Sequence, residues 1–217
     1  MRKIAICLTV LMSICLSVRS EAGLFGNDVD LADLSQLSSE TLTTLKDVEF
    51  EVFMAKVKHA GAKVRENRAR EDLKSAKSRS DTKSIELKAA KAKYKEVSES
   101  NAGKRASEAQ AALQSMQKQY DIIQLLVKWK KKELDVQSAG AAKEKAAVSV
   151  AEANRELARA MKIVESKVPS AGRYNLDDFK KSLEKRKKEY DKAVAREKKE
   201  VIDAKTLKME YEKTAKL

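Results

Sequence analysis

Apolar side chains recur at a helical spacing through most of the chain. In each of three long segments, these apolar side chains recur at steps close to seven residues. Sustained repeats of this kind indicate long helices packed along an apolar seam. We therefore expect an all-α fold, an elongated antiparallel coiled-coil bundle of three long helices. The repeating positions include Val48, Ala55, Ala62, Ala69 and Ala76; Ala106, Leu113, Tyr120, Val127, Leu134, Ala141 and Val148, then Val150, Leu157 and Val164; and Leu176, Phe179, Leu183, Tyr190, Val194, Val201, Ala204, Tyr211 and Ala215.

Two polar breaks, at 98–105 and 166–175, separate these segments. The second break holds the single proline of the chain, Pro169, and is followed by Asn175 and Asp177, either of which can cap the next helix. The predicted helices run over about 39–98, 105–166 and 176–216. Short connections make consecutive helices antiparallel, with the third folded back along the hairpin. Ser80 or Asp81 could also cap a new helix, which would give four helices instead of three.

The N-terminus is typical of an export signal. Arg2 and Lys3 precede the apolar run 4–18, and "SEA" at 20–22 supplies small residues for cleavage. As a helix this run would rise about 22 Å, short of the roughly 30 Å hydrocarbon core of a membrane. We expect residues 1–22 to be a cleaved signal peptide. Residues 23–38 should form an acidic flexible lead that ends in a turn or two of helix, before the helical hairpin and third helix of 39–217.

Composition supports helices and an exported location. The chain has 217 residues, of which 36% are charged and 5% aromatic, with six glycines. Both cysteines, Cys7 and Cys15, lie in the expected signal, so the mature chain has no thiol for a disulfide or a metal site. We expect the periplasm or cell envelope of a bacterium, or secretion if the source is not a Gram-negative bacterium.

Charge is distributed unevenly along the chain. Residues 23–55 carry seven acidic side chains and one basic one, whereas 56–101 carry 14 basic and seven acidic ones. A basic helical surface favours an anionic partner, for which we consider anionic lipid, lipopolysaccharide or an acidic protein face. Nucleic acid also fits a basic chain, but an export signal argues against it.

Motifs for catalysis, cofactors and metals are missing from the sequence. His59 is the only histidine, and no nucleophile motif, phosphate-binding glycine loop or metal-ligand spacing accompanies it. We expect no enzyme activity, no cofactor and no metal, with His59 as a partly exposed residue of a helix seam.

The leading hypothesis is a structural scaffold or binding protein. The alternative is a chaperone, because the chain resembles Skp-type periplasmic chaperones in being small, exported, basic and helical. That family also has a small β-rich body, and the mature chain has no strand pattern for one.

The segment 122–132, "IIQLLVKWKKK", is unusually apolar and ends in three lysines. If the first hairpin turns near residue 101, facing residue numbers sum to roughly 203, and the segment meets the polar stretch 73–81. A third helix folded about residue 171 would reach back only to about residue 125. We expect the uncovered side chains to mediate self-association, with a dimer favoured, or to contact a membrane surface. The predicted interaction residues are Ile122, Leu126, Trp129, Lys128, Lys130, Lys131 and Lys132.

Overall fold

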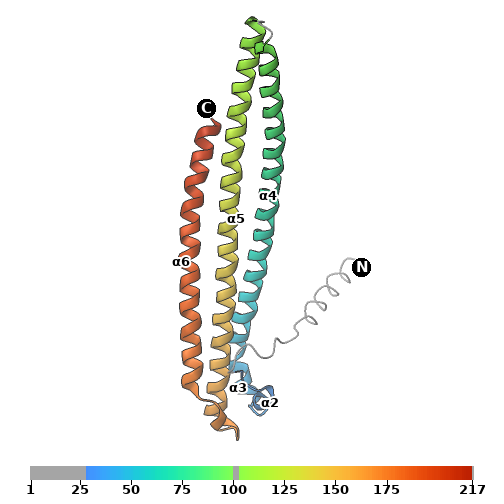
Figure 1. Ribbon diagram of the computed structural model, residues 1–217. Coiled ribbons are helices and arrows are strands. Elements are labelled where there is room, and N and C mark those ends of the chain that lie inside the picture. The colour runs from blue at the N-terminus through green and yellow to red at the C-terminus, as the bar shows by residue number, and fades with distance from the viewer. Residues whose placement is uncertain (1–27, 100–102, 217) are drawn as a thin grey trace, which may run out of the picture.

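The computed structural model describes residues 28–99 and 103–216, which are mostly helical and contain no strand. Three long helices dominate them and lie side by side in Figure 1, with the chain reversing direction between successive helices. The all-α prediction of long helices packed against one another is confirmed. The elements are α2 (Leu31–Leu34), α3 (Ser39–Thr44), α4 (Lys46–Glu99), α5 (Gly103–Glu165), the 3-10 turn η1 (Ala171–Arg173) and α6 (Leu176–Ala215).

The central helix is α5. Both α4 and α6 pack along it, and in the described residues they make no extensive contact with each other (Figure 1). An arrangement of three helices in a row leaves α4 and α6 each with one side against α5 and the opposite side facing outward. This explains why α5 has few fully exposed side chains over its second half, whereas α4 and α6 have many.

The register of the α4–α5 hairpin agrees with the expected sum of about 203. Lys130 Nζ donates to Asp72 Oδ2 at 3.2 Å, and Ser138 Oγ donates to Glu66 Oε1 at 3.2 Å. Gln124 Nε2 donates to Ser80 Oγ at 2.7 Å. Ser80 therefore bonds to the neighbouring helix and does not begin a new one, so α4 continues without a break through residues 75–84.

The predicted seam positions lie between the helices. Ala62, Ala69 and Ala76 of α4 are buried, as are Phe179 and Leu183 of α6. Small alanine side chains allow α4 and α5 to approach closely, which compensates for the scarcity of large core residues. At the start of α6, the side chain of Asn175 accepts a hydrogen bond from the backbone N–H of Asp177, so Asn175 is the cap.

A compact base closes the open end of the hairpin. Val29, Leu34, Leu37 and Leu45 pack there with residues of α5, the 166–175 connection and α6. The expected flexible lead therefore differs over residues 28–38, because these apolar side chains are anchored in the base and α2 is a single helical turn. Leu45, only 5% exposed, holds the boundary between α3 and α4 in place. The expected signal peptide and residues 23–27 lie outside the described residues.

Candidate functional site

The apolar segment 122–132 is covered by its own chain. Leu126 is 6% exposed and Ile123 8%, and both pack with Ala76 of α4 and, at the margin, with Tyr211 of α6. Trp129 is half-buried and stacks on Tyr211 with ring centroids 5.4 Å apart. The expectation that this cluster would lack cover is therefore wrong for Leu126 and Trp129.

The reason lies in the helical phase of the facing stretch 73–81. Its polar side chains point to solvent, while Leu73, Ala76 and Ser80, spaced three and four residues apart, turn toward α5 and are buried. A stretch that is polar on average thus presents a largely apolar face to the cluster. Tyr211 lies near the C-terminal end of α6, and its aromatic ring covers Trp129.

Two of the cluster's lysines bind acidic side chains of neighbouring helices. Lys130 forms ion pairs with Asp72 of α4 at 3.2 Å and with Glu133 at 2.6 Å. Lys132 forms ion pairs with Glu200 at 2.6 Å and Asp203 at 3.2 Å on α6. The hydrogen bond from Lys132 to Glu200 is the main cause of the raised pKa of Lys132. Lys130 therefore connects α5 to α4, and Lys132 connects α5 to α6.

The other predicted interaction residues are less engaged. Lys128 and Lys131 are exposed and form no ion pair in the described chain, and Ile122 is half-buried. Lys130 also lies 4.7 Å from the centroid of the Trp129 ring, and Lys208 of α6 lies 5.7 Å from it. The indole therefore sits under two cations, an arrangement that further fixes its orientation.

A row of cations runs along the outer face of α6. Its six members, spaced three or four residues apart, are all exposed. A helix places residues at this spacing on one side, so the row covers about 27 Å of surface. We call it the α6 basic row; it consists of Lys181, Lys185, Lys188, Lys192, Arg196 and Lys199.

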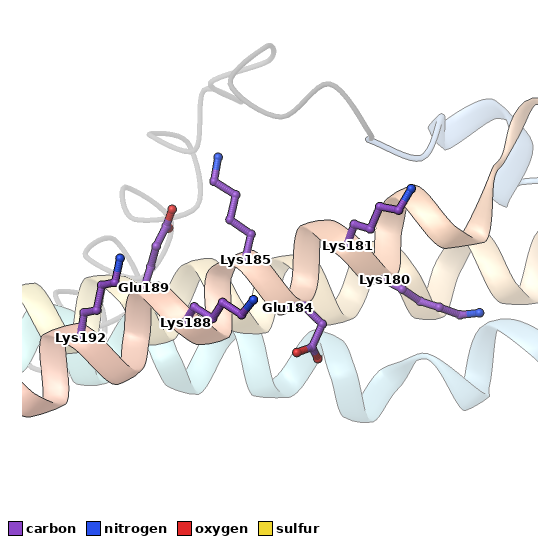
Figure 2. A pocket seen from close by; sticks show the side chains of 7 residues that line it. All are labelled: Lys180, Lys181, Glu184, Lys185, Lys188, Glu189 and Lys192. Atoms are coloured by element: carbon purple, nitrogen blue, oxygen red, sulfur yellow. The ribbon is translucent and has the colours of Figure 1, made fainter.

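Most of the α6 basic row has no acidic partner. Lys181 lies 3.8 Å from Asp178, but the other five members form no ion pair in the described chain. Figure 2 shows Lys181, Lys185 and Lys192 extending from the same side of α6 around a shallow, open hollow. Glu189 shares this side but pairs with Arg186 at 3.1 Å. The sequence predicted a basic body without locating this row; its spacing over 181–199 is the signal that could have done so.

Polar contacts at the base hold the N-terminal segment and are structural. Glu156, 7% exposed, accepts hydrogen bonds from the backbone N–H of Val29 at 3.0 Å and from Arg155 and Arg159 at 2.8 and 3.0 Å. The Tyr174 hydroxyl donates to Asp33, and this bond is the main cause of the lowered pKa of Asp33. Burial is the main cause of the raised pKa of Tyr174.

Metal-binding clusters are not found in the described part of the chain. Residues 28–99 and 103–216 contain no group of three or more His, Cys, Asp or Glu side chains that could hold a metal ion. His59 is half-buried on α4, and its Nε2 atom has no hydrogen-bond partner there. Within the same ranges, no helix combines the length and apolar character needed to cross a membrane.

Comparison of the chain with protein-family models, with curated proteins and with solved structures gives no match. The geometry of the chain itself is therefore the basis for the functional proposal.

Proposed function

We propose that the protein is an exported, non-enzymatic coiled-coil scaffold or binding protein of the bacterial envelope, and that the α6 basic row binds an anionic surface. The observation that carries the proposal is the alignment of six exposed cations, five without an acidic partner. Lys130 and Lys132, by contrast, are bound to acidic side chains of neighbouring helices. Cations left unpaired along one straight face are available to an external polyanion.

The headgroups of an anionic membrane fit this row best. Its members point outward from a rigid helix, so several can reach a flat surface at once. Each Lys or Arg near an anionic membrane contributes about 1 kcal/mol, which falls off with added salt. The row could therefore hold the elongated bundle along the membrane without any spanning segment. Phosphate groups of lipopolysaccharide offer the same chemistry, and an acidic protein face is a further candidate.

Vesicle flotation in a salt series tests the proposal. The full-length mature protein should bind vesicles that contain anionic lipid at low salt and dissociate from them as the salt concentration rises. It should not bind neutral vesicles. The variant Lys185→Glu, Lys188→Glu, Lys192→Glu should bind at least about 100-fold more weakly, since three attractive charges worth about 1 kcal/mol each are replaced by repulsive ones. A parallel arm with lipopolysaccharide in place of phospholipid separates these two sources of phosphate.

A control variant with the same net charge is available on α4. Lys74, Lys88 and Lys91 are exposed and form no ion pair in the described chain. Reversing these three lysines should leave vesicle binding nearly intact. Equal losses in the two triple variants would show that net charge, and not the α6 basic row, is responsible. Binding that is insensitive to salt and to lipid charge would contradict the proposal outright.

The chaperone alternative gains no specific support. Skp-type chaperones have a β-rich body, and residues 28–99 and 103–216 form no strand. A trimer that suppresses aggregation of an unfolded membrane protein would be the result in favour of that alternative.

A further inference from the structure

The outer face of α4 carries an apolar stripe that nothing in the described chain covers. Phe50 is 61% exposed, Phe53 59%, Met54 37%, Val57 49% and Val64 51%. The rings of Phe50 and Phe53 lie side by side with centroids 6.3 Å apart. Single exposed apolar residues are common on protein surfaces, whereas a contiguous group of this size marks an interaction site. We call these five residues the α4 stripe.

The stripe has the spacing of a helix-packing seam. Phe50, Met54, Val57, Gly61 and Val64 follow one another at alternating steps of four and three residues. This is the repeat with which one helix packs lengthwise on another.

The known partner of α4 lies on its other side. Ala55 and Ala62 face α5 and are half-buried and buried, and they stand about 160° and 140° around the helix from Val57. A helix that is apolar on two opposite faces is ordinarily packed on both. In this protein α5 covers one of those faces, and α6, which lies beyond α5, cannot reach the other (Figure 1).

We propose that the α4 stripe binds the α4 stripe of a second copy of this chain, with the two α4 helices antiparallel. The two-fold axis passes between Met54 and Val57, so that each Met54 packs against Val57 of the other copy. The same register places Phe50 opposite Gly61 of the second copy. Such an interface uses one patch twice, which is the commonest symmetry of protein dimers.

Charges beside the stripe identify the second copy as the partner. Along one edge, Asp47 and Glu51 are followed by Lys58 and Arg65, and all four are exposed. None of them forms an ion pair in the described chain, although Glu51 accepts a 3.4 Å hydrogen bond from Asn154. In the antiparallel register, Glu51 meets Lys58 of the other copy and Asp47 meets Arg65. Each pair occurs twice by symmetry, so the edge is complementary to itself.

A parallel pair would not use these charges. It would bring this edge against the opposite edge of the other α4, which carries Phe53, Ala60 and Asn67, none of them charged. The charged residues Glu49, Lys56 and Lys63 lie further round α4 from the stripe and are engaged in their own chain, with Arg159, Glu152 and Glu66 respectively. The unengaged charges therefore select the antiparallel arrangement.

Gly61 provides the space that this register requires. A glycine inside a helix lowers helix stability, and this one has no evident steric reason within the described part of its chain. A Cβ atom at Gly61 would meet only Nη1 of Arg65, at 3.7 Å, which is an ordinary contact. A glycine beside an exposed apolar seam suits the close approach of a large side chain from outside, and the Phe50 ring of the second copy is such a side chain.

The size of the surface indicates a reversible dimer. With about 150–250 Å² for each aromatic side chain, the exposed parts of the stripe amount to on the order of 400 Å² per copy. The charged edge adds to this, which brings the total buried area to about 1,000 Å², the lower end of specific interfaces. We expect a dissociation constant in the micromolar range.

Sedimentation velocity of the full mature chain over a concentration series tests this proposal. The wild type should shift reversibly from monomer to dimer, and Val57→Lys should remain monomeric at every concentration with unchanged circular dichroism. Ile85→Lys is the matched control, because Ile85 is 67% exposed on α4 but lies outside the stripe. It should dimerise like the wild type. A wild type that stays monomeric, or a Val57→Lys variant that still dimerises, would overturn the proposal.

A charge exchange tests the antiparallel register. Glu51→Lys and Lys58→Glu should each weaken the dimer several-fold, because each brings like charges together. The double variant should recover wild-type affinity, because its edge is again complementary to itself. Failure to recover would refute the antiparallel pairing. These measurements use no lipid. A wild type that dimerises but does not bind anionic vesicles would therefore count against the proposed function alone.

Discussion

The indole ring of Trp129 on α5 stacks on the ring of Tyr211 on α6, with centroids 5.4 Å apart and planes inclined by 27°. Tyr211 lies close to the C-terminal end of α6, which ends at Ala215. This single aromatic contact therefore fixes the far end of the third helix to the central one. It also completes the cover over Leu126.

Replacing Tyr211 by Ala should lower the free energy of unfolding by about 2 kcal/mol, because the aromatic contact and part of the buried area are lost together. Urea denaturation followed by the emission of Trp129, the only tryptophan, measures it. The native emission should also move to longer wavelength as water reaches the indole. Met209→Ala is the control, since Met209 is 62% exposed two residues away. Similar effects in both variants would count against the stacking contact as the anchor.

The sequence indicated the long helices and the register of the hairpin, but not the phase of every face. The expected segments 39–98, 105–166 and 176–216 compare with observed helices Ser39–Thr44, Lys46–Glu99, Gly103–Glu165 and Leu176–Ala215. The break at Leu45 was not predicted, because it depends on burial of Leu45 in a base assembled from distant segments. Ser80 looked like a helix cap, because a sequence does not show that Gln124 bonds to it across the hairpin.

The candidate surfaces were harder to predict than the helices. Segment 122–132 stood out by composition, yet its cover depends on which side chains of 73–81 turn inward. The α4 stripe was not predicted, although its signal is present in the sequence. The same helix shows a second repeat through Phe50, Val57 and Val64, beside the one through Val48, Ala55 and Ala62. The sequence does not show that only one other helix packs on α4. For that reason it does not show that one of the two apolar repeats is left uncovered.

Replacing Glu156 by Gln should release the N-terminal segment from the base. The buried carboxylate accepts hydrogen bonds from Val29, Arg155 and Arg159, and the amide would leave the two guanidinium groups with Glu49 as their only acidic partner in the described chain. We expect a loss of about 2–3 kcal/mol and faster hydrogen exchange at the amides of 29–37. Glu165→Gln, which removes an exposed partner of Lys162, should cost less than about 0.5 kcal/mol. Unchanged exchange in the Glu156 variant would show that apolar packing alone holds the segment.

Stability of the base should fall in acid. The bond from Tyr174 lowers the pKa of Asp33 below its ordinary value of 3.8. A carboxyl group with a lowered folded-state pKa stabilises the fold above pH 3.8 and loses that contribution as pH falls through the folded-state pKa. Tyr174→Phe removes this bond, so it should melt at a lower temperature than the wild type at pH 6, and the difference should shrink below pH 3.8. Thermal melts across pH 2–7 decide it; a difference that is constant with pH would contradict the role of the bond.

Replacing Lys167 by Gly should stabilise the protein. Lys167 follows the end of α5 with φ of 53°, the left-handed region that costs an ordinary residue about 1 kcal/mol. Its side chain is exposed and forms no ion pair in the described chain, so little is lost with it. We expect a gain of about 0.5–1 kcal/mol by chemical denaturation. Lys167→Ala keeps the Cβ atom and should give no comparable gain. A gain in both variants would place the effect in the lysine side chain instead of the backbone.

The two glycines inside long helices, Gly61 and Gly140, should respond differently to alanine. In a helix interior alanine is more stable than glycine by about 0.8–1 kcal/mol, provided that the added Cβ finds space. At Gly61 the nearest atom to a Cβ is Nη1 of Arg65 at 3.7 Å, so the monomer should gain nearly the full amount. At Gly140 a Cβ would lie 3.1 Å from Oε1 of Glu197 on α6.

That carboxylate also pairs with Lys143 at 2.8 Å, and its displacement should offset much of the gain in helix stability at Gly140. Urea denaturation at protein concentrations low enough to keep the chain monomeric should therefore rank Gly61→Ala above Gly140→Ala. Gly61→Ala should nevertheless weaken the dimer at high concentration, because the Cβ takes the space assigned to Phe50 of the second copy. A variant that stabilises the monomer while weakening its association separates the two roles of Gly61. If Gly61→Ala instead strengthened association, Phe50 could not pack against this position, and the register about Met54 and Val57 would be wrong.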